Sequence, residues 1–171
     1  PNMVVMAPKD ENELRRMIYT AVCHEGGPVA VRYPRGSALG VPMDGELRPL
    51  PLGKGELLRE GTDVGLLALG STVAAAVEAA VRLEEEGSSV AVANLRFAKP
   101  LDEDLIVGLA ETTSHLFTLE ENVLSGGFGS QVALLLRRKD CRGTLLTTLG
   151  IPDRFVPHGT QAELRRDLGL D

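Results

Sequence analysis

The feature that most constrains the fold is a regular alternation of short apolar runs with helical patterns between residues 63 and 168. Apolar runs at 63–69, 89–95, 115–119 and 144–148 are separated by helical segments at 72–86, 102–111 and 129–138, and a last helix is expected over 160–168. This alternation is typical of βαβ units with parallel strands. It predicts a complete three-layer α/β/α domain, with residues 55–59 as a candidate edge strand.

A separate strand, helix, strand pattern precedes this region. An apolar run at 3–6 is followed by Asp10 and Glu13, which form an Asp-x-x-Glu capping pattern at the start of a helix, and a second strand is expected at 28–33. One βαβ unit of two neighbouring parallel strands buries too little surface to fold alone. We therefore expect residues 1–37 to be the end of a larger sheet, Pro- and Gly-rich residues 38–52 to be a linker, and residues 53–171 to be a second domain.

Composition excludes several classes of function. The formal net charge of −6 argues against nucleic-acid binding. The basic clusters, which include Arg165 with Arg166, fall on expected helices and indicate solvated faces. No apolar run approaches the roughly 20 residues of a membrane-spanning helix. Cys23 and Cys141 fit no disulfide or metal spacing, which indicates reduced thiols and a cytoplasmic protein.

Most polar motifs have a structural explanation. Ser71 or Thr72 can cap the helix that follows strand 63–69, or the helix start can hold an anion. The glycine turn at 125–130 lacks the Gly-x-Gly-x-x-Gly pattern, so a tight turn is favoured over a dinucleotide site. Glu120 and Glu121 are adjacent on an expected strand and should point to opposite faces, which argues against a shared reacting group. The three histidines match no metal site.

Residues 31–36 carry the one candidate site residue. A strand runs through Arg32 and Tyr33 into Pro34-Arg35-Gly36, where Pro34 ends the strand and directs Arg35 out of it. A fixed guanidinium at the carboxyl end of a strand suits a phosphate or carboxylate, because its donors form two parallel hydrogen bonds. An interdomain salt bridge explains the same position, and both interpretations stay open on physical grounds.

Five groups of motifs run in order through nearly the whole chain: Arg32-Tyr33-Pro34-Arg35-Gly36, Pro51-Leu52-Gly53-Lys54-Gly55, residues 95–102 (LRFAKPLD), Glu120-Glu121-Asn122 with Gly127-x-Gly129-Ser130, and residues 149–155 (LGIPDRF) with Gly159-Thr160-Gln161. Together they closely resemble a known family, the 1-deoxy-D-xylulose-5-phosphate synthases. The glycine turn is also similar to that of transketolases and the β subunits of 2-oxoacid dehydrogenases, so the equivalent region of one of those enzymes is an alternative.

The resemblance implies a three-domain, transketolase-like homodimer. Such an enzyme joins pyruvate, after loss of CO₂, to D-glyceraldehyde 3-phosphate, and the product feeds isoprenoid, thiamine and pyridoxal synthesis. Its cofactors are thiamine diphosphate, whose ylid attacks pyruvate, and Mg²⁺. Residues 1–37 would then end the pyrimidine-binding domain, and residues 53–171 would form the transketolase C-terminal-like domain.

The resemblance also says which parts this chain supplies. Arg35 matches the family's arginine for the phosphate of the aldehyde substrate. The catalytic, cofactor-binding and metal-binding residues are expected upstream in the same polypeptide, because Pro1-Asn2-Met3 indicates a chain that begins mid-protein, and a further helix is expected after residue 170. The isolated chain is therefore expected to be inactive. A non-catalytic module that completes a partner's sheet and dimer surface is the alternative from another class.

Overall fold

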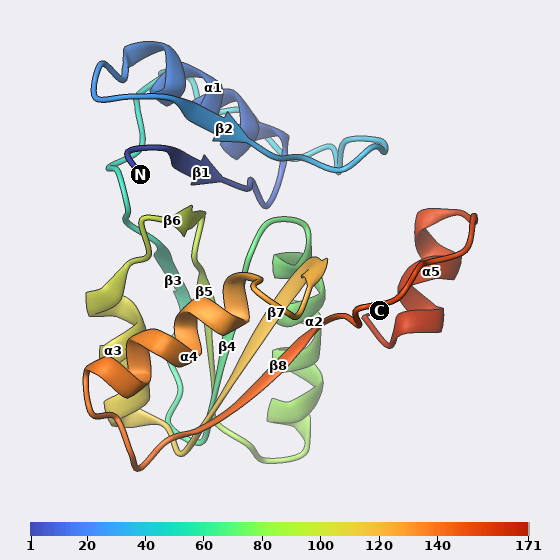
Figure 1. The fold of residues 1–171 in the computed structure, drawn as a ribbon. Coiled ribbons are helices and arrows are strands. Elements are labelled where there is room, and N and C mark those ends of the chain that lie inside the picture. Colours follow the sequence, from blue (N-terminus) through green and yellow to red (C-terminus); the bar gives the residue numbers. More distant parts are fainter. Residues whose placement is uncertain (171) are drawn as a thin grey trace.

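The computed structural model describes residues 1–170 and confirms the predicted α/β fold (Figure 1). Five strands form the larger sheet, in the order β3-β5-β4-β7-β8. Four of them are parallel and the edge strand β3 is antiparallel to β5, which confirms the candidate edge strand. The strands are β3 (Glu56–Arg59), β4 (Val64–Ala68), β5 (Val90–Asn94), β7 (His115–Val123) and β8 (Leu145–Ile151).

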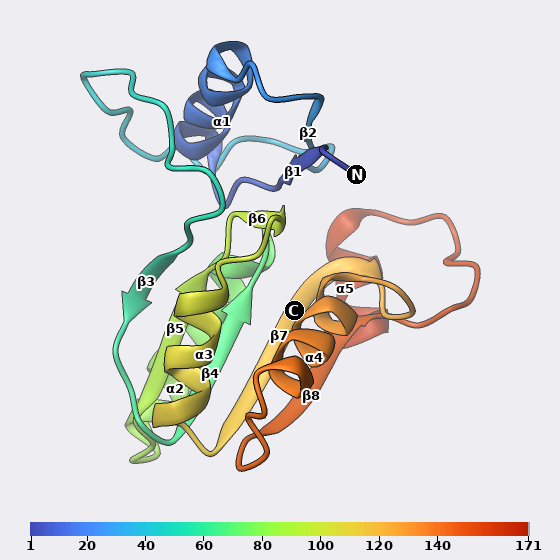
Figure 2. The same cartoon turned by 60° about the vertical axis from the view of Figure 1, so that its left-hand side comes forward.

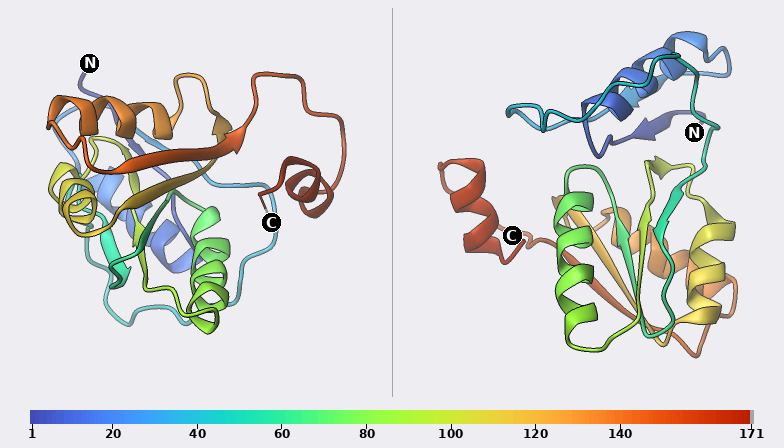
Figure 3. Two further views of the ribbon diagram at one scale, coloured as in Figure 1. Left: turned by 90° about the horizontal axis from the view of Figure 1, so that it is seen from below. Right: turned by 180° about the vertical axis from the view of Figure 1, so that it is seen from behind.

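Three helices cover the two faces of this sheet, as the sequence predicted. Helix α2 (Thr72–Glu85) lies on one face, and α3 (Glu103–Thr112) and α4 (Phe128–Arg138) lie on the other (Figure 3). Adjacent residues of β4 divide between the two cores: Leu66 packs on the α2 side and Leu67 on the side of α3 and α4. Because both faces are covered, every residue of β5 is buried.

The N-terminal unit contains β1 (Val4–Met6), α1 (Glu11–Cys23) and β2 (Val29–Val31). Strands β1 and β2 are parallel neighbours, with Val4 opposite Val29, as expected. The second strand is shorter than predicted. The Arg32 amide still donates to the Met6 carbonyl at 2.8 Å, but the pairing does not reach Pro34, which has no amide proton to donate.

Strand β6 (Phe97–Lys99) was not predicted; it follows β5 in the chain and pairs antiparallel with β1 of the N-terminal unit. It is an edge strand of the smaller sheet, whose order is β2-β1-β6, on the side that faces the larger sheet (Figure 2). Phe97 is completely buried in a small core with Met6, Met17 and Leu50. A strand of three residues carries no detectable periodicity of its own, and its pairing depends on a partner more than 90 residues away.

Residues 38–52 contain no helix or strand, but they are not a free linker. Leu50 is buried and its amide donates to Thr20 Oγ1 of α1 at 2.7 Å. The division into units at 37 and 53 stays a prediction.

The last helix, α5 (Gln161–Leu168), stands away from the larger sheet and has no buried residue (Figure 1). Cys23 is exposed and Cys141 is partly buried, and neither forms a disulfide within residues 1–170. Within residues 1–170, no helix is both long enough and apolar enough to cross a membrane.

Candidate functional site

A cavity of about 460 Å³ lies beside the Arg35 turn, where the N-terminal unit meets the first turns of α2 and α5. Segments from four parts of the chain line it: residues 8–11 with Leu14, residues 33–39, Ser71 with Ala74, and Gln161 with Arg165. It therefore opens where β2 and β4 end, which is where ligands bind in parallel α/β sheets.

Arg35 lines this cavity and is exposed. Within residues 1–170 its guanidinium makes no hydrogen bond or ion pair, so the interdomain salt bridge proposed for it has no partner there. Arg32 instead contacts Glu121 of β7. Its Nη2 atom lies 3.3 Å from the Glu121 carbonyl oxygen and 3.6 Å from Glu121 Oε2.

Glu121 is a contact point that sequence reasoning missed. Besides Arg32, its carboxylate accepts hydrogen bonds from Arg165 Nε at 2.8 Å and Arg165 Nη2 at 2.6 Å, and from the Ser71 hydroxyl. The expectation of a solvated Arg165 was therefore wrong. Ser71 forms no side-chain cap on α2, because its hydroxyl donates to Glu121. Neither pairing has a local sequence signal, since the partners lie 44 and 50 residues apart.

Glu120 points to the other face of β7, as predicted. Its carboxylate is fully buried and accepts from the amides of Phe128 at 2.7 Å and Gly129 at 2.8 Å, and from Asn122 Nδ2 at 2.8 Å. The two amides belong to the first turn of α4, where a negative charge is favourable. The glycine turn is therefore a tight structural turn whose free amides are already satisfied by a carboxylate of the same chain.

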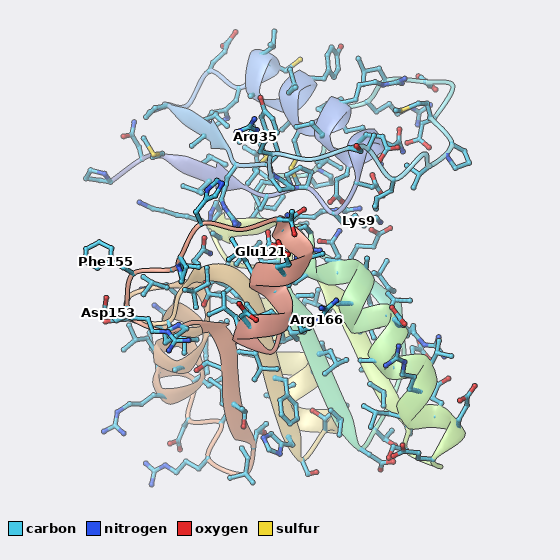
Figure 4. The ribbon with its side chains drawn as sticks, turned by 90° about the vertical axis from the view of Figure 1, so that its right-hand side faces the viewer. Lys9, Arg35, Glu121, Asp153, Phe155 and Arg166 are labelled. Carbon is cyan, nitrogen blue, oxygen red and sulfur yellow. The ribbon has the colours of Figure 1, made fainter. Side chains whose placement is uncertain are left out.

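A second charged cluster joins α1 to β3 and to the segment after β5, and its Lys9 also lines the cavity. The buried carboxylate of Glu13 accepts from Arg96 Nε at 2.7 Å and from Asn94 Nδ2 at 2.9 Å, and Arg96 also donates to Glu56 at 2.8 Å. Lys9, labelled in Figure 4, completes the cluster with a 2.7 Å contact to Glu56. Removing one member of a buried charge cluster is costly, because the others lose their compensation.

This cluster changes the predicted capping pattern. Asp10 does cap α1, accepting from the Glu13 amide at 2.7 Å. The Glu13 carboxylate does not return to the Asp10 amide; it accepts from the Lys9 amide at 2.8 Å and is otherwise occupied by Asn94 and Arg96. Arg96 has a backbone φ of 56°, a left-handed conformation that non-glycine residues rarely adopt.

Glu11, at the start of α1, fixes the loop that follows the Arg35 turn. Its carboxylate accepts from the amides of Leu39, Gly40 and Val41. A hydrogen bond from its own backbone amide is the largest cause of its lowered pKa, and the three loop amides lower it further. One acidic side chain therefore keeps this wall of the cavity in place.

The residues of this chain do not fit the implied cofactors. In the part of the chain that the structure describes, no three His, Cys, Asp or Glu side chains are grouped as ligands for a metal ion. The amides of Phe128 and Gly129 at the glycine turn, the donors that a diphosphate would need, already donate to Glu120. The cavity instead offers the Arg35 guanidinium, which has no partner among residues 1–170, and it suits an anionic group on a small molecule.

Comparison with known proteins gives matches over the whole chain. Residues 53–171 match the family model described as the transketolase C-terminal domain. The chain is 57% identical over its full length to 1-deoxy-D-xylulose-5-phosphate synthase 1 of Geobacter metallireducens, and 54% identical over 99% of its length to 1-deoxy-D-xylulose-5-phosphate synthase of Pelotomaculum thermopropionicum. It spans about a quarter of each, 27% and 26%.

A solved structure described as a split gene transketolase, inactive beta4 tetramer, is similar in fold. The TM-score is 0.87 at 35% identity, over 99% of this chain and 54% of the other.

Proposed function

Because the chain belongs to the transketolase C-terminal domain family over residues 53–171, we propose that it works as part of a 1-deoxy-D-xylulose-5-phosphate synthase. The proposed enzyme condenses pyruvate, with loss of CO₂, with D-glyceraldehyde 3-phosphate. The 57% identity over all 171 residues of this chain to a protein of that name supports this assignment over a transketolase or a dehydrogenase β subunit.

At the level of the site, the proposal rests on the side chain of Arg35. Its guanidinium lines a cavity of about 460 Å³ and has no partner within residues 1–170, whereas the neighbouring Arg32 and Arg165 are both paired with Glu121. We infer that Arg35 binds the phosphate of the aldehyde substrate. A guanidinium makes two parallel, charge-assisted hydrogen bonds to phosphate, which fixes both position and orientation.

Thiamine diphosphate and Mg²⁺ would be held by other segments of the enzyme, since the residues described here do not fit them. When bound, the thiazolium ring supplies the carbanion chemistry. This chain would contribute the Arg35 wall of the aldehyde site and a structural surface in a cytoplasmic homodimer. A purely structural module is the competing proposal, and the test below separates the two.

The test is Arg35→Ala in the complete enzyme, assayed with glyceraldehyde 3-phosphate and with an aldehyde that lacks the phosphate. Loss of a hydrogen bond to a charged group costs about 1.5 to 3 kcal/mol, so kcat/KM for the phosphorylated aldehyde should fall by about 10- to 150-fold. Arg35→Lys should recover only part of this loss, because an ammonium cannot reproduce the fork of donors.

The wild-type enzyme and Arg35→Ala should turn over the aldehyde without phosphate almost equally, and the KM for pyruvate should change little. Equal losses for the two aldehydes would show that Arg35 supports the structure and does not bind phosphate.

A further inference from the structure

Glu121 holds two of the elements between which the Arg35 turn lies. On one side Arg32, three residues before Arg35, contacts both the carbonyl and the carboxylate of Glu121. On the other side Arg165 of α5 donates to the same carboxylate through Nε and Nη2. The Glu121 side chain is 14% exposed, whereas Arg165 is 31% and Arg32 40% exposed, so the Arg165 contact is the better shielded from water of the two.

Helix α5 in turn lies against the Arg35 turn. A Cβ atom added at Gly36 would stand 3.4 Å from Oε1 of Gln161, the first residue of α5, and both Gln161 and Arg165 line the cavity with Arg35. Figure 4 shows Arg35 in the layer of β1 and β2, above Glu121. Any movement of α5 would therefore change the surroundings of Arg35.

Few other contacts hold α5 in place. It has no buried residue, and its own side-chain bonds, the capping box of Thr160 and Glu163, are local. Among the residues described, the ion pair of Arg165 with Glu121 is the one salt bridge that joins α5 to the rest of the molecule. A helix without a buried apolar face depends on such a contact for its position.

We propose that Glu121 is a positioning residue for the substrate phosphate: it fixes the strand before Arg35 through Arg32, and the helix beside Arg35 through Arg165. This inference rests on the proposed function. Its physical content is that one carboxylate pairs with two of the arginines at the site, and that within residues 1–170 Arg35 keeps a guanidinium without a partner. Glu121 itself touches no substrate in this proposal.

The first measurement is steady-state kinetics of Glu121→Gln in the complete enzyme with its cofactors. Glutamine has the same shape and lacks the charge, so Arg165 and Arg32 should be held less firmly. The expected result is a rise of about tenfold in KM for glyceraldehyde 3-phosphate, the lower end of what one hydrogen bond to a charged group contributes, with kcat little changed. Arg165→Gln should behave similarly.

Arg166→Gln is the matched control, since Arg166 is the next residue on the same helix and is exposed (Figure 4). It should leave KM unchanged. In hydrogen exchange, the amides of α5 should exchange faster in Glu121→Gln and Arg165→Gln than in Arg166→Gln. Unchanged exchange in both variants would contradict the proposed anchoring.

The deciding experiment adds Glu121→Gln to Arg35→Ala. If Glu121 acts through Arg35, the double variant should bind the phosphorylated aldehyde no more weakly than Arg35→Ala. A difference of up to about twofold is the usual scatter in such comparisons and counts as no change. If the second substitution costs a further tenfold, Glu121 acts independently of Arg35 and this inference is wrong while the proposed function stands. If Arg35→Ala alone leaves kcat/KM for the phosphorylated aldehyde unchanged, the phosphate role of Arg35 fails, and the inference fails with it.

Discussion

At Gly129, the close approach of α4 to β7 leaves no room for a side chain. An added Cβ would lie 2.5 Å from Thr118 Oγ1 and 2.8 Å from Thr148 Cγ2, both of which belong to the sheet beneath the helix. Thr118 is completely buried and cannot move aside without disturbing its neighbours. The helix must come this close for the Gly129 amide to reach Glu120.

Gly129→Ala should therefore lower the free energy of unfolding by about 1 to 3 kcal/mol, the usual cost of overpacking. Gly108→Ala is the matched control, because Gly108 also lies in a helix and nothing stands within 4 Å of its added Cβ. That variant should gain about 0.5 to 1 kcal/mol from helix propensity. Denaturant unfolding of both variants checks the pair, and equal effects would refute the packing argument.

Glu56 gives the charged cluster a pH dependence. Burial raises the pKa of this carboxyl and is the largest single effect, but the hydrogen bonds from Lys9 and Asn94 and the charges of Arg96 and Lys9 together outweigh it, so the pKa is lowered. A carboxyl with a lowered folded-state pKa contributes stability above its unfolded value of 4.5 and loses it as the pH falls through the folded-state pKa.

The stability of the wild-type chain should thus fall as the pH drops below about 4.5, and Glu56→Gln should show a shallower fall. Glu60→Gln is the control, since Glu60 is exposed just beyond the same strand, and it should retain the wild-type slope. Urea unfolding at a series of pH values measures this. Parallel curves for Glu56→Gln and wild type would mean that the cluster adds no pH-dependent stability.

At the scale of elements, the two sheets differ in how well their strands are supported. Strand β4 has parallel partners on both sides and is covered on both faces, whereas β2 has only β1 as a neighbour and no fully buried residue. Local opening is easiest where few apolar contacts hold a strand.

Hydrogen exchange on the 171-residue chain should find the amides of Val64–Ala68 well protected and those of Val29–Val31 poorly protected. The reason is that opening β2 breaks one short ladder, while opening β4 disrupts both cores. Equal protection in the two strands would contradict the expectation that residues 1–37 depend on further strands for their stability.

At the scale of the whole molecule, the chain is expected not to bind thiamine diphosphate by itself. The amides of its glycine turn already donate to Glu120, and the residues described contain no group of three His, Cys, Asp or Glu side chains that could hold Mg²⁺. Calorimetric titration of the purified chain with thiamine diphosphate and Mg²⁺ should give no measurable heat of binding. Micromolar binding would show that the cofactor site has been misplaced.

The sequence by itself determined the class of the fold and nearly all of its helices and strands. Those features follow from local periodicity and from short-range chemistry, such as the Asp10 cap and the glycines of the 125–130 turn. The alternation of side chains along a strand likewise sufficed to separate Glu120 from Glu121.

Only the tertiary structure decided which distant groups meet. The pairing of β6 with β1, the contacts of Glu13 with Asn94 and Arg96, and the meeting of Arg32, Ser71 and Arg165 at Glu121 all join residues 40 or more positions apart. An exposed arginine and a paired one look the same in a sequence, because the partner is fixed by how the sheets and helices pack. For that reason the sequence pointed to Arg35, but the residue that we infer positions it emerged only from the folded chain.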